Sequence, residues 1–326
     1  MTLSSSITDR PQVYTLSVDQ DYEQQRLDNF LFRELKGVPK SKVYQMIRKG
    51  EVRVNKKRIK PDYRLQSGDQ IRIPPVRQSQ AQQEVWVEST KTQEIEKRIL
   101  FEDDGLIILN KPAGWAVHGG SGISLGIIEA LRVSRPKKTL ELVHRLDRGT
   151  SGCLMIAKKR SVLKRLNEAL KEGEVRKTYV ALVSGPWSKR TTLVDQPLLK
   201  RELPEGGRMV KVDSRGKAAK TKFQLLISNP QVSLIRAMPI TGRTHQIRVH
   251  CQYAGHSIIG DEAYGSAILD RAVKGWGVNG MCLHAYQLEL PDEEGKKMQI
   301  TAPLPANLQA AMERLKKEKG VVHEKL

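Results

Sequence analysis

The sequence has few cysteines and no long apolar run, and each shortage excludes a class of protein. The three cysteines lie far apart and form no CxxC pair, which argues against a disulfide framework and a zinc ribbon. No stretch approaches the roughly 18 apolar residues of a membrane span. Residues 1–11 lack the basic and apolar segments of a secretion signal. We therefore expect a cytoplasmic protein that does not bind membranes.

Acidic residues are scarce relative to basic ones. The 326-residue chain carries 56 lysines and arginines against 36 aspartates and glutamates, a formal net charge of +20. Half of this excess lies in residues 26–77, where fifteen basic residues stand against five acidic ones, a net charge of +10. Such clustering favours a polyanionic partner such as nucleic acid over a uniformly basic surface.

The basic region predicts a small module of two helices followed by short strands. Apolar residues recur at helical spacing over residues 27–35, and Ser41 is expected to cap a second helix that ends at Gly50. Apolar and polar residues alternate over residues 52–54 and 71–73, which is typical of half-buried strands.

Composition divides the rest of the chain. Residues 1–21 are expected to be a flexible lead and residues 22–76 the small module. Residues 77–97 are rich in Gln, Ser and Glu and poor in apolar residues, which predicts a mobile linker. A large domain is then expected over residues 98–326.

Within the large domain, the polar segment 144–152 (HRLDRGTSG) separates two apolar runs, residues 140–143 and 153–157. Both runs are short and partly β-branched, as in buried strands. A carboxylate in the loop between them is held rigidly yet stays reachable. Asp147 is therefore the first catalytic candidate, although an Asp in a turn of Gly, Ser and Thr is more often only a turn former.

Helix and ribbon signals surround this loop. Ser161 is expected to cap a helix that ends at Gly173, and Thr244 a helix that runs to Tyr253. Residues 186–220 are polar, basic and glycine-containing, which suggests an excursion of ribbon-like strands that could embrace RNA.

Four further segments of the large domain resemble sequence blocks of a known enzyme family. They are NKPAG at 110–114, KTYVALV at 177–183, GRTHQIRVH at 242–250 and LHA at 283–285. Together with HRLDRGTSG, they resemble the signature blocks of the RluA-type pseudouridine synthases. The small module resembles the S4 RNA-binding domain through RLD at 26–28, SK at 41–42 and the segment 48–55.

The resemblance implies a fold and a function. The fold is α+β, with a mixed, largely antiparallel sheet, flanking helices and a central cleft, preceded by a small α/β S4-like domain. The small module and its RIPPVR segment at 72–77 most resemble the branch that acts on 23S ribosomal RNA. The activity would be isomerisation of uridine to pseudouridine after the base leaves its stack. The reaction is redox-neutral, and we expect no cofactor, no nucleotide and no metal.

The resemblance also implies roles for individual residues. Asp147 would act at the sugar, and Arg248 would pair with it. Tyr179 would lie against the uracil and help to remove the C5 proton. Arg145 would fill the space that the flipped base leaves. The remaining residues assigned to the large domain are His144 as a substrate contact and Leu146, His118 and Ile247 as supporting residues.

Phosphate contacts are assigned to the small module, because its basic residues crowd the second helix and the turn after it. The assigned residues are Lys42, Arg48, Lys49, Arg53, Lys56, Lys57 and Arg58.

Two other functions remain possible at this point. A non-catalytic RNA-binding or ribosome-assembly protein would explain the basic module but not Asp147, Tyr179 and Arg248 together. A zinc deaminase would also flip a base, but the sequence lacks the H-x-E and P-C-x-x-C motifs. We expect a monomer. The sequence leaves open which uridines react and whether Asp147 attacks C1′, attacks C6 or abstracts a sugar proton.

Overall fold

The chain forms two compact units, Met1–Trp86 and Val87–Leu326. No helix in the described parts of either unit is long and apolar enough to cross a membrane. The computed structural model describes residues 13–35, 38–76, 89–119, 126–136, 139–202, 208–266, 271–318 and 321–324.

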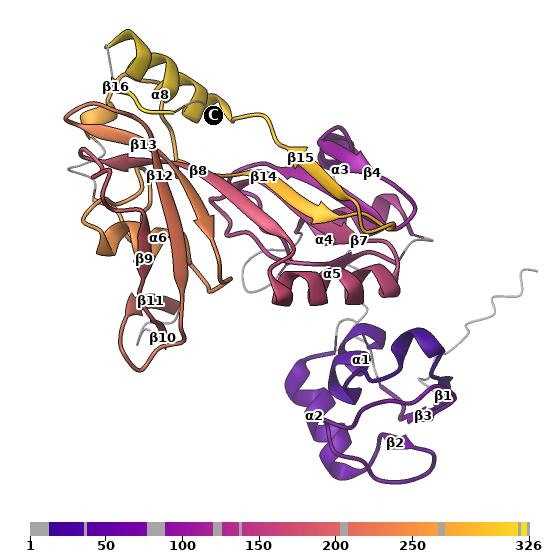
Figure 1. Cartoon of the computed structure of the whole chain (residues 1–326). Coiled ribbons are helices and arrows are strands. Elements are labelled where there is room, and N and C mark those ends of the chain that lie inside the picture. The colour runs from indigo at the N-terminus through magenta and orange to yellow at the C-terminus, as the bar shows by residue number, and fades with distance from the viewer. Residues whose placement is uncertain are drawn as a thin grey trace, which may run out of the picture. The chain divides into compact units, whose positions relative to one another are not determined.

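The small unit combines two helices with a three-stranded antiparallel sheet of order β1-β3-β2 (Figure 1). Strand β1 (Tyr14–Ser17) lies within residues 1–21 and pairs with β3, so the prediction of a flexible lead is wrong for the described residues 13–21. Ile71 and Ile73 are fully buried, whereas Arg72 between them is exposed, as the alternation predicted. The elements of this unit are β1 (Tyr14–Ser17), the 3-10 helix η1 (Gln20–Tyr22), α1 (Leu27–Glu34), α2 (Lys40–Lys49), β2 (Arg53–Val54) and β3 (Gln70–Ile73).

The two ends of the second helix in the small unit are formed in different ways. Helix α2 starts at Lys40 directly after Pro39, and no side chain caps it. The predicted Ser41 cap is therefore wrong, because Ser41 already lies inside the helix. At the other end, Gly50 adopts φ 70°, the left-handed conformation that glycine allows at a helix terminus.

The large unit is built on one mixed sheet of eleven described strands, and its order confirms the predicted fold class. The central path is β16-β12-β13-β8-β14-β7-β5-β4, and β15, β6 and β9 pair at its sides. Among the described strands, only β7 and β14 pair in parallel. The bounds are β4 (Ile99–Glu102), β5 (Leu106–Lys111), β6 (Glu141–Leu142), β7 (Ser151–Ala157), β8 (Arg176–Ser184), β9 (Leu193–Asp195), β12 (Lys220–Ser228), β13 (Val232–Pro239), β14 (Leu283–Pro291), β15 (Lys297–Thr301) and β16 (Val321–Val322).

Helices flank this sheet, and a two-stranded ribbon accompanies it (Figure 1). The ribbon lies within residues 186–220, where strands were predicted. Its strands are β10 (Leu198–Glu202) and β11 (Arg208–Val212), and the helical elements are α3 (Ser89–Glu96), α4 (Ile127–Ser134), α5 (Arg160–Glu172), α6 (Gln246–Tyr253), the 3-10 helix η2 (Arg271–Val273) and α8 (Ala306–Lys317).

The apolar run that follows the Asp147 loop is buried on both faces of the sheet. In β7, Leu154 and Ile156 join one core cluster, which includes residues of α4 and α8. Cys153 and Met155, which point the other way, join a second cluster with residues of α5. A strand covered on both faces needs a continuous apolar run, which explains why β7 shows no polar alternation.

Gly152 explains how the Asp147 loop enters the sheet. It adopts φ 104°, and a Cβ atom there would lie 2.2 Å from the carbonyl oxygen of Ala285. Any larger residue would push apart the parallel pair of β7 and β14. The glycine of the TSG segment therefore fixes where the polar loop ends and the buried strand begins.

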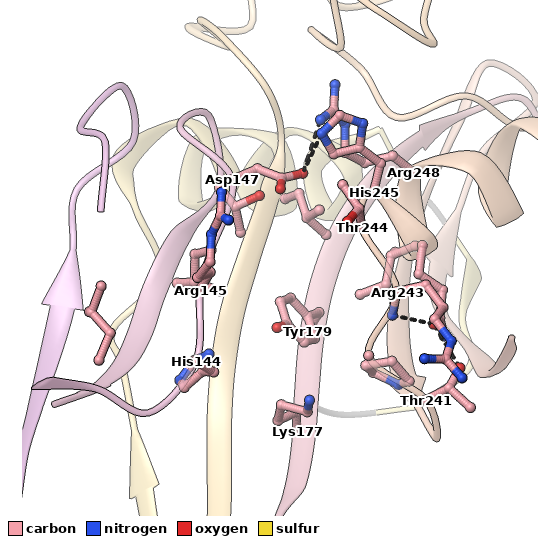
Figure 2. Close-up of a pocket in the computed structure, with 18 of the residues that line it drawn as sticks. His144, Arg145, Asp147, Lys177, Tyr179, Thr241, Arg243, Thr244, His245 and Arg248 are labelled. Carbon is pink, nitrogen blue, oxygen red and sulfur yellow. Dashed lines mark hydrogen bonds and ion pairs between the residues drawn. The ribbon is translucent and has the colours of Figure 1, made fainter. Parts of the chain in front are cut away.

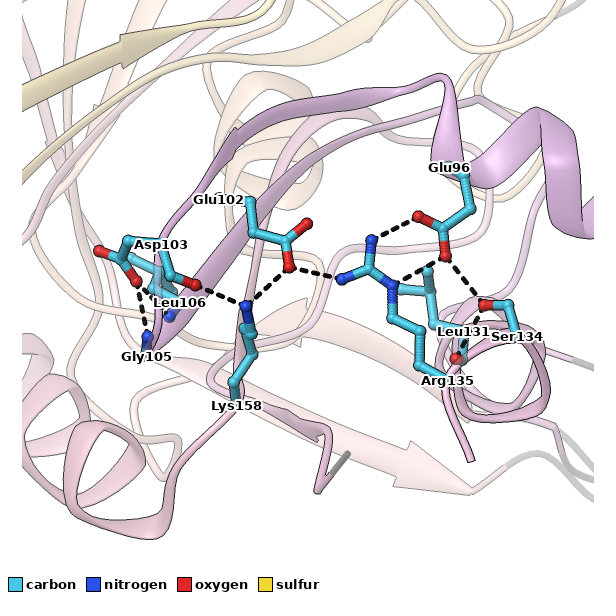
Figure 3. A network of polar contacts seen from close by, with 9 residues as sticks. All are labelled: Glu96, Glu102, Asp103, Gly105, Leu106, Leu131, Ser134, Arg135 and Lys158. Atoms are coloured by element: carbon cyan, nitrogen blue, oxygen red, sulfur yellow. Dashed lines mark hydrogen bonds and ion pairs between the residues drawn. The ribbon is translucent and has the colours of Figure 1, made fainter. Parts of the chain in front are cut away.

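Part of the predicted linker is helical instead. Residues 77–88 lie outside the described residues, but Ser89–Glu96 forms α3. Ile95 is fully buried in the core of the large unit. Glu96 binds Arg135, which also binds Glu102, and Lys158 extends this network to Asp103 (Figure 3). The prediction of a mobile segment up to residue 97 is therefore wrong for α3.

Two predicted helix caps are also wrong. Helix α5 begins at Arg160, so Ser161 lies within its first turn, and no side chain caps the helix. Helix α6 begins at Gln246 after His245, which adopts φ 53°. The loop before α6 is held by the Gln246 amide oxygen, which accepts hydrogen bonds from the Arg243 backbone and the Thr241 hydroxyl.

Candidate active site

A pocket of about 530 Å³ lies where the Asp147 loop, β8 and the loop before α6 meet (Figure 2). Ligand sites usually have roughly 300–1,000 Å³. Segments more than a hundred residues apart in the sequence contribute to it. All the site residues predicted in the large domain line this pocket: His118, His144, Arg145, Leu146, Asp147, Tyr179, Ile247 and Arg248.

Asp147 is held by a guanidinium that is itself held by a second carboxylate. Arg248 donates from Nη1 to Asp147 Oδ2 over 2.9 Å, so the pairing implied by the resemblance is present. Its Nε and Nη2 donate to the two oxygens of Asp261, each over 2.7 Å. The Asp261 side chain is fully buried, and that of Asp147 remains 29% exposed. Arg248 is thus held by Asp261 through Nε and Nη2, and its Nη1 is directed at the reachable carboxylate of Asp147.

A second contact to Asp147 comes from His245. Its Nε2 lies 3.8 Å from Asp147 Oδ2, and its Nδ1 lies 2.7 Å from the Tyr264 hydroxyl. That hydroxyl accepts a hydrogen bond from the Val210 backbone, so its own proton has His245 Nδ1 as acceptor. This arrangement leaves the ring proton on Nε2, facing Asp147. Burial lowers the pKa of His245, while Asp147 opposes the shift, so the ring is neutral at neutral pH.

Lys111 ties the loop that carries Asp147 to the NKPAG segment. Its Nζ donates to the carbonyl oxygens of Pro112, Trp115 and Arg148 over 2.9, 2.7 and 3.0 Å. Three acceptors require the three protons of an ammonium group. Burial lowers the pKa of Lys111 to about 7, and the nearby negative charge of Asp147 opposes this. The lysine therefore holds Asp147 in place from beneath the loop.

Two histidines anchor the ends of the same loop. The backbone N–H of Met155 donates to His144 Nε2 over 3.1 Å, and burial lowers the pKa of His144 to about 3. His144 is thus a neutral acceptor that fixes the loop to β7, although it also lines the pocket. Ser151 lies 2.8 Å from Nδ1 of the fully buried His284. The loop is rigid at both of its ends.

Tyr179 forms part of the apolar wall of the pocket. It is 9% exposed, and Leu146 and Ile247 beside it are 8% and 6% exposed. Burial raises the pKa of Tyr179, and the charge of Asp147 raises it further. Its phenol is therefore neutral in the free protein. A planar aromatic ring flanked by aliphatic side chains suits the face of a flat base.

Two cations of the pocket have no partner in the described part of the chain. Arg145 is exposed, and no described residue forms a hydrogen bond or ion pair with its guanidinium. Lys177 lies on β8 two residues before Tyr179, and its Nζ also has no such partner among the described residues. These groups are available to a ligand, unlike Arg248 and Lys111.

The comparisons with known proteins agree with this geometry. Residues 105–253 match the RNA pseudouridylate synthase family and residues 25–71 match the S4 domain. Ribosomal large subunit pseudouridine synthase C of Haemophilus ducreyi is 49% identical over 98% of this chain and 100% of its own length. The protein of the same name from Escherichia coli K12 is 48% identical over 95% and 98%. The chain belongs to the pseudouridine synthase family.

Solved structures support the same assignment. Human RNA pseudouridylate synthase domain containing 4 is 26% identical, with a TM-score of 0.58, over 70% of this chain and 96% of its own. Human RNA pseudouridylate synthase domain containing 1 gives a TM-score of 0.54 at 26% identity, over 70% of this chain and 89% of its own. This pseudouridine synthase is an isomerase whose substrate is RNA.

Four residues around Asp147 were missed by the sequence analysis: Asp261, Tyr264, Lys111 and His245. Asp261, Tyr264 and Lys111 do not carry obvious catalytic signals, because their contacts join segments that are distant in the sequence. One signal was available for Asp261. A buried arginine such as Arg248 is not balanced by a single, partly exposed carboxylate, so a second carboxylate partner was to be expected. In the described residues, no group of three or more His, Cys, Asp or Glu side chains could hold a metal ion.

The basic residues on α2 and the turn around β2 in the small unit of this pseudouridine synthase are exposed, unlike Arg248 and Lys111 of the large unit. We call these eight residues the basic face. None of them forms a salt bridge with a described residue, and Arg53 and Arg58 donate to backbone carbonyls. The basic face comprises Lys40, Lys42, Arg48, Lys49, Arg53, Lys56, Lys57 and Arg58.

Proposed function

We propose that this enzyme converts specific uridines of 23S ribosomal RNA to pseudouridine, with Asp147 as the catalytic carboxylate. The observation that carries the proposal is the position of Asp147: partly exposed in the pocket, yet fixed by Arg248, which Asp261 holds from behind. The relatives that match nearly the whole chain are named for the large ribosomal subunit, which supports the choice of RNA.

The residues of the pocket suit each requirement of the reaction. The target base leaves its stack at a cost of a few kcal/mol, and the unpartnered guanidinium of Arg145 can stack in the vacated space. Tyr179 lies against the extruded uracil. Asp147 acts at the nucleoside as nucleophile or base while the N-glycosidic bond breaks. The base then turns and C5 bonds to C1′, which breaks any bond that Asp147 has formed to the sugar. The C5 proton leaves, and N1 takes up a proton, so the product is an isomer of the substrate.

Tyr179 can assist the last of these steps in one way only. A neutral phenol is a weak base, and burial keeps Tyr179 in this form. It can accept the C5 proton only if it passes its own proton to a water molecule at the same time. The hydroxyl is therefore assigned to proton transfer and the ring to stacking.

The small unit would position the RNA through phosphate contacts of the basic face, without reading the base sequence. Its substrate would place the enzyme with the ribosomes in the cytoplasm. We propose that a single chain suffices, because all the segments that line the pocket lie within one compact unit of the chain, the large unit.

The experiment is to map pseudouridine in 23S ribosomal RNA from cells with and without this protein. Purified protein is then added to unmodified RNA from the deficient cells. We expect specific pseudouridines to be missing from the deficient cells and to be restored by the protein in vitro. Unchanged pseudouridine in 23S RNA would refute the proposed substrate, and restoration by an Asp147→Asn protein would refute the role of the carboxylate.

A further inference from the structure

The side chain of Lys177 has no function in the mechanism given so far. Lys177 and Tyr179 are two residues apart on β8, so their side chains lie on the same face of the strand. Lys177 lines the pocket, and burial lowers the pKa of its ammonium group. A Cβ atom on Gly242 would lie 3.7 Å from Nζ, which places the ammonium beside the loop before α6.

A partly buried charge without a partner is unfavourable for the free protein. Removing an ammonium from water carries a free-energy cost that an ion pair or hydrogen bonds normally offset. For Lys177, none of the described residues supplies such a partner. A ligand that brings an acceptor to this position would offset the cost.

Lys177 lies at the opposite end of the pocket from Asp147. Figure 2 shows Asp147 at one end, Tyr179 in the middle and Lys177 at the other end. The electrostatic influences on the pKa values follow the same order. Asp147 contributes to the raised pKa of Tyr179, whereas only burial accounts for the shift of Lys177.

The chemistry of uracil places a carbonyl oxygen at this far end. In uridine, N1 carries the sugar and the C4 carbonyl lies directly across the ring. In pseudouridine, C5 carries the sugar and the C2 carbonyl lies across the ring. With the sugar at Asp147 and the base against Tyr179, a carbonyl oxygen therefore points toward Lys177 both before and after the base turns.

We propose that Lys177 is a catalytic residue that donates a hydrogen bond to the uracil carbonyl oxygen opposite the sugar, O4 in the substrate and O2 in the product. This inference rests on the proposed function. When the glycosidic bond breaks, its electron pair stays with the base, and the negative charge spreads to the carbonyl oxygens. An ammonium in a partly desolvated site stabilises that charge. Lys177 transfers no proton, so it is unchanged at the end.

The same contact would discriminate between bases. Cytosine carries an amino group at C4, and an ammonium has no acceptor for its protons. A cytidine in the pocket would leave Lys177 without a partner and place two donors against each other. Rejection of cytosine then needs no further side chain.

The first test replaces Lys177 by methionine, which keeps the length of the side chain and removes the charge. We expect the single-turnover rate on target RNA to fall about 100-fold, as on removal of other charge-stabilising donors. RNA affinity should hardly change, and the melting temperature should stay equal or rise because a desolvated charge is gone. Arg176→Met is the matched control, since Arg176 is the exposed neighbour on the same strand; it should keep the normal rate.

The second test changes the RNA and leaves the protein intact. Replacing the target uridine by 4-thiouridine puts sulfur, a weaker acceptor, at the position of O4. We expect the intact enzyme to slow markedly, and the Lys177→Met variant to lose little beyond its own defect. Equal rates of the intact enzyme on both RNAs would overturn the proposal, even if the variant failed to fold.

The outcomes separate this inference from the proposed function. Intact protein that isomerises no uridine of 23S RNA would refute the proposed function and the Lys177 proposal with it. Active intact protein together with an equally active Lys177→Met variant would refute the role of Lys177 alone.

Discussion

The pocket of the large unit and the basic face of the small unit are both positively charged, but they hold their charges in opposite ways. At the pocket, Arg248 binds two carboxylates, and beneath the Asp147 loop Lys111 binds three carbonyl oxygens. On the basic face, all eight side chains are exposed, and none forms a salt bridge with a described residue. Buried, fixed charges orient reacting groups, whereas exposed charges bind phosphates and add affinity.

This difference predicts two kinds of variant. A change in the pocket should alter turnover and leave RNA affinity nearly intact. A change on the basic face should alter affinity and its salt dependence, and leave turnover at saturating RNA nearly intact. A pocket variant that mainly weakens RNA binding, or a basic-face variant that mainly lowers turnover, would contradict this difference.

The largest effect is expected for Asp147→Asn. The substitution keeps the size of the side chain and removes its charge and nucleophilicity, so turnover should fall by at least about a thousandfold. Release of tritium from RNA labelled at C5 of uridine measures turnover, and filter binding measures affinity, which should stay near normal. Asp104→Asn, at an exposed turn, is the control. Substantial residual turnover of the Asp147 variant would remove Asp147 from the mechanism.

Arg248→Met comes next. It frees Asp147 and leaves the fully buried carboxylate of Asp261 without its cation. Breaking a buried pair in this way costs about 3–5 kcal/mol of stability, and we expect turnover to fall about a hundredfold or more. Urea unfolding and single-turnover rates on one preparation measure both effects.

Arg314→Met provides the matched control for Arg248. Arg314 pairs with Glu318 on the surface of α8, and its side chain is 52% exposed. Exposed pairs contribute about 0–1 kcal/mol, so this variant should keep its stability and turnover. Equal behaviour of the two variants would show that Asp261 does not hold Arg248 in a functional position.

Tyr179→Phe should have an intermediate effect. The ring stays and only the hydroxyl is removed, so stacking and melting temperature should be unchanged while turnover falls about 10- to 100-fold because proton transfer is impaired. Rearranged product that still carries the C5 proton should accumulate. Tyr253→Phe, at a position 55% exposed, is the control. Normal turnover with a lower melting temperature would mark Tyr179 as a packing residue.

The sequence predicted those features of the site that depend on local patterns of residues. The apolar runs around HRLDRGTSG predicted two strands with a polar loop between them, and β6 and β7 are those strands. The signature blocks indicated which loops meet, so Asp147, Tyr179 and Arg248 line one pocket. The alternation over residues 71–73 likewise predicted β3.

The features that the sequence did not predict depend on contacts across the fold. Asp261 and Lys111 look like an ordinary turn aspartate and a surface lysine until the fold buries them beside the Asp147 loop. The caps failed because Pro39 and the left-handed backbone of His245 set where the helices begin. Helix α3 was missed because its sequence is short and polar, and Ile95 is the one residue buried in the core among the α3 side chains that the structure describes.

For Lys111, the buried lysine beneath the Asp147 loop, we expect a smaller effect, which is a pH dependence of the free energy of unfolding. The pKa of Lys111 is about 7 in the folded protein and about 10.4 in an unfolded chain. Between these values the unfolded chain binds more protons, so the free energy of unfolding rises with pH. Relative to Lys111→Met, the intact protein should gain stability between pH 7 and pH 10, by at most about 1.4 kcal/mol per pH unit.

Urea unfolding of both proteins at several pH values measures this gain. Below pH 7 the lysine is protonated in both states, and the difference between the two proteins should level off. A difference that stays constant up to pH 10 would show that Lys111 keeps its proton throughout. The lysine would then be a fixed charge at every working pH.

The smallest effect on turnover is expected on the basic face. Replacing Lys56, Lys57 and Arg58 by glutamine should weaken RNA binding and flatten the dependence of log affinity on log salt by about 0.7 to 0.9 for each phosphate that is no longer neutralised. Removal of residues 1–76 should do the same more strongly. The large unit has its own core, so the truncated protein should still modify a short RNA at high concentration, with poorer choice of site.

The triple variant Lys164→Gln, Lys316→Gln and Lys317→Gln removes the same charge from exposed positions on α5 and α8. Both triple variants carry the same net charge, so any difference between them reports the place of the charge rather than its amount. We expect the control to keep most of its affinity and its salt slope, and both variants to reach the normal rate at saturating RNA. Equal weakening in both would mean that the basic face attracts RNA only through the overall charge of the protein. The small unit would then not be the main RNA-binding site. The assignment of catalysis to the pocket and of RNA binding to the basic face would be wrong.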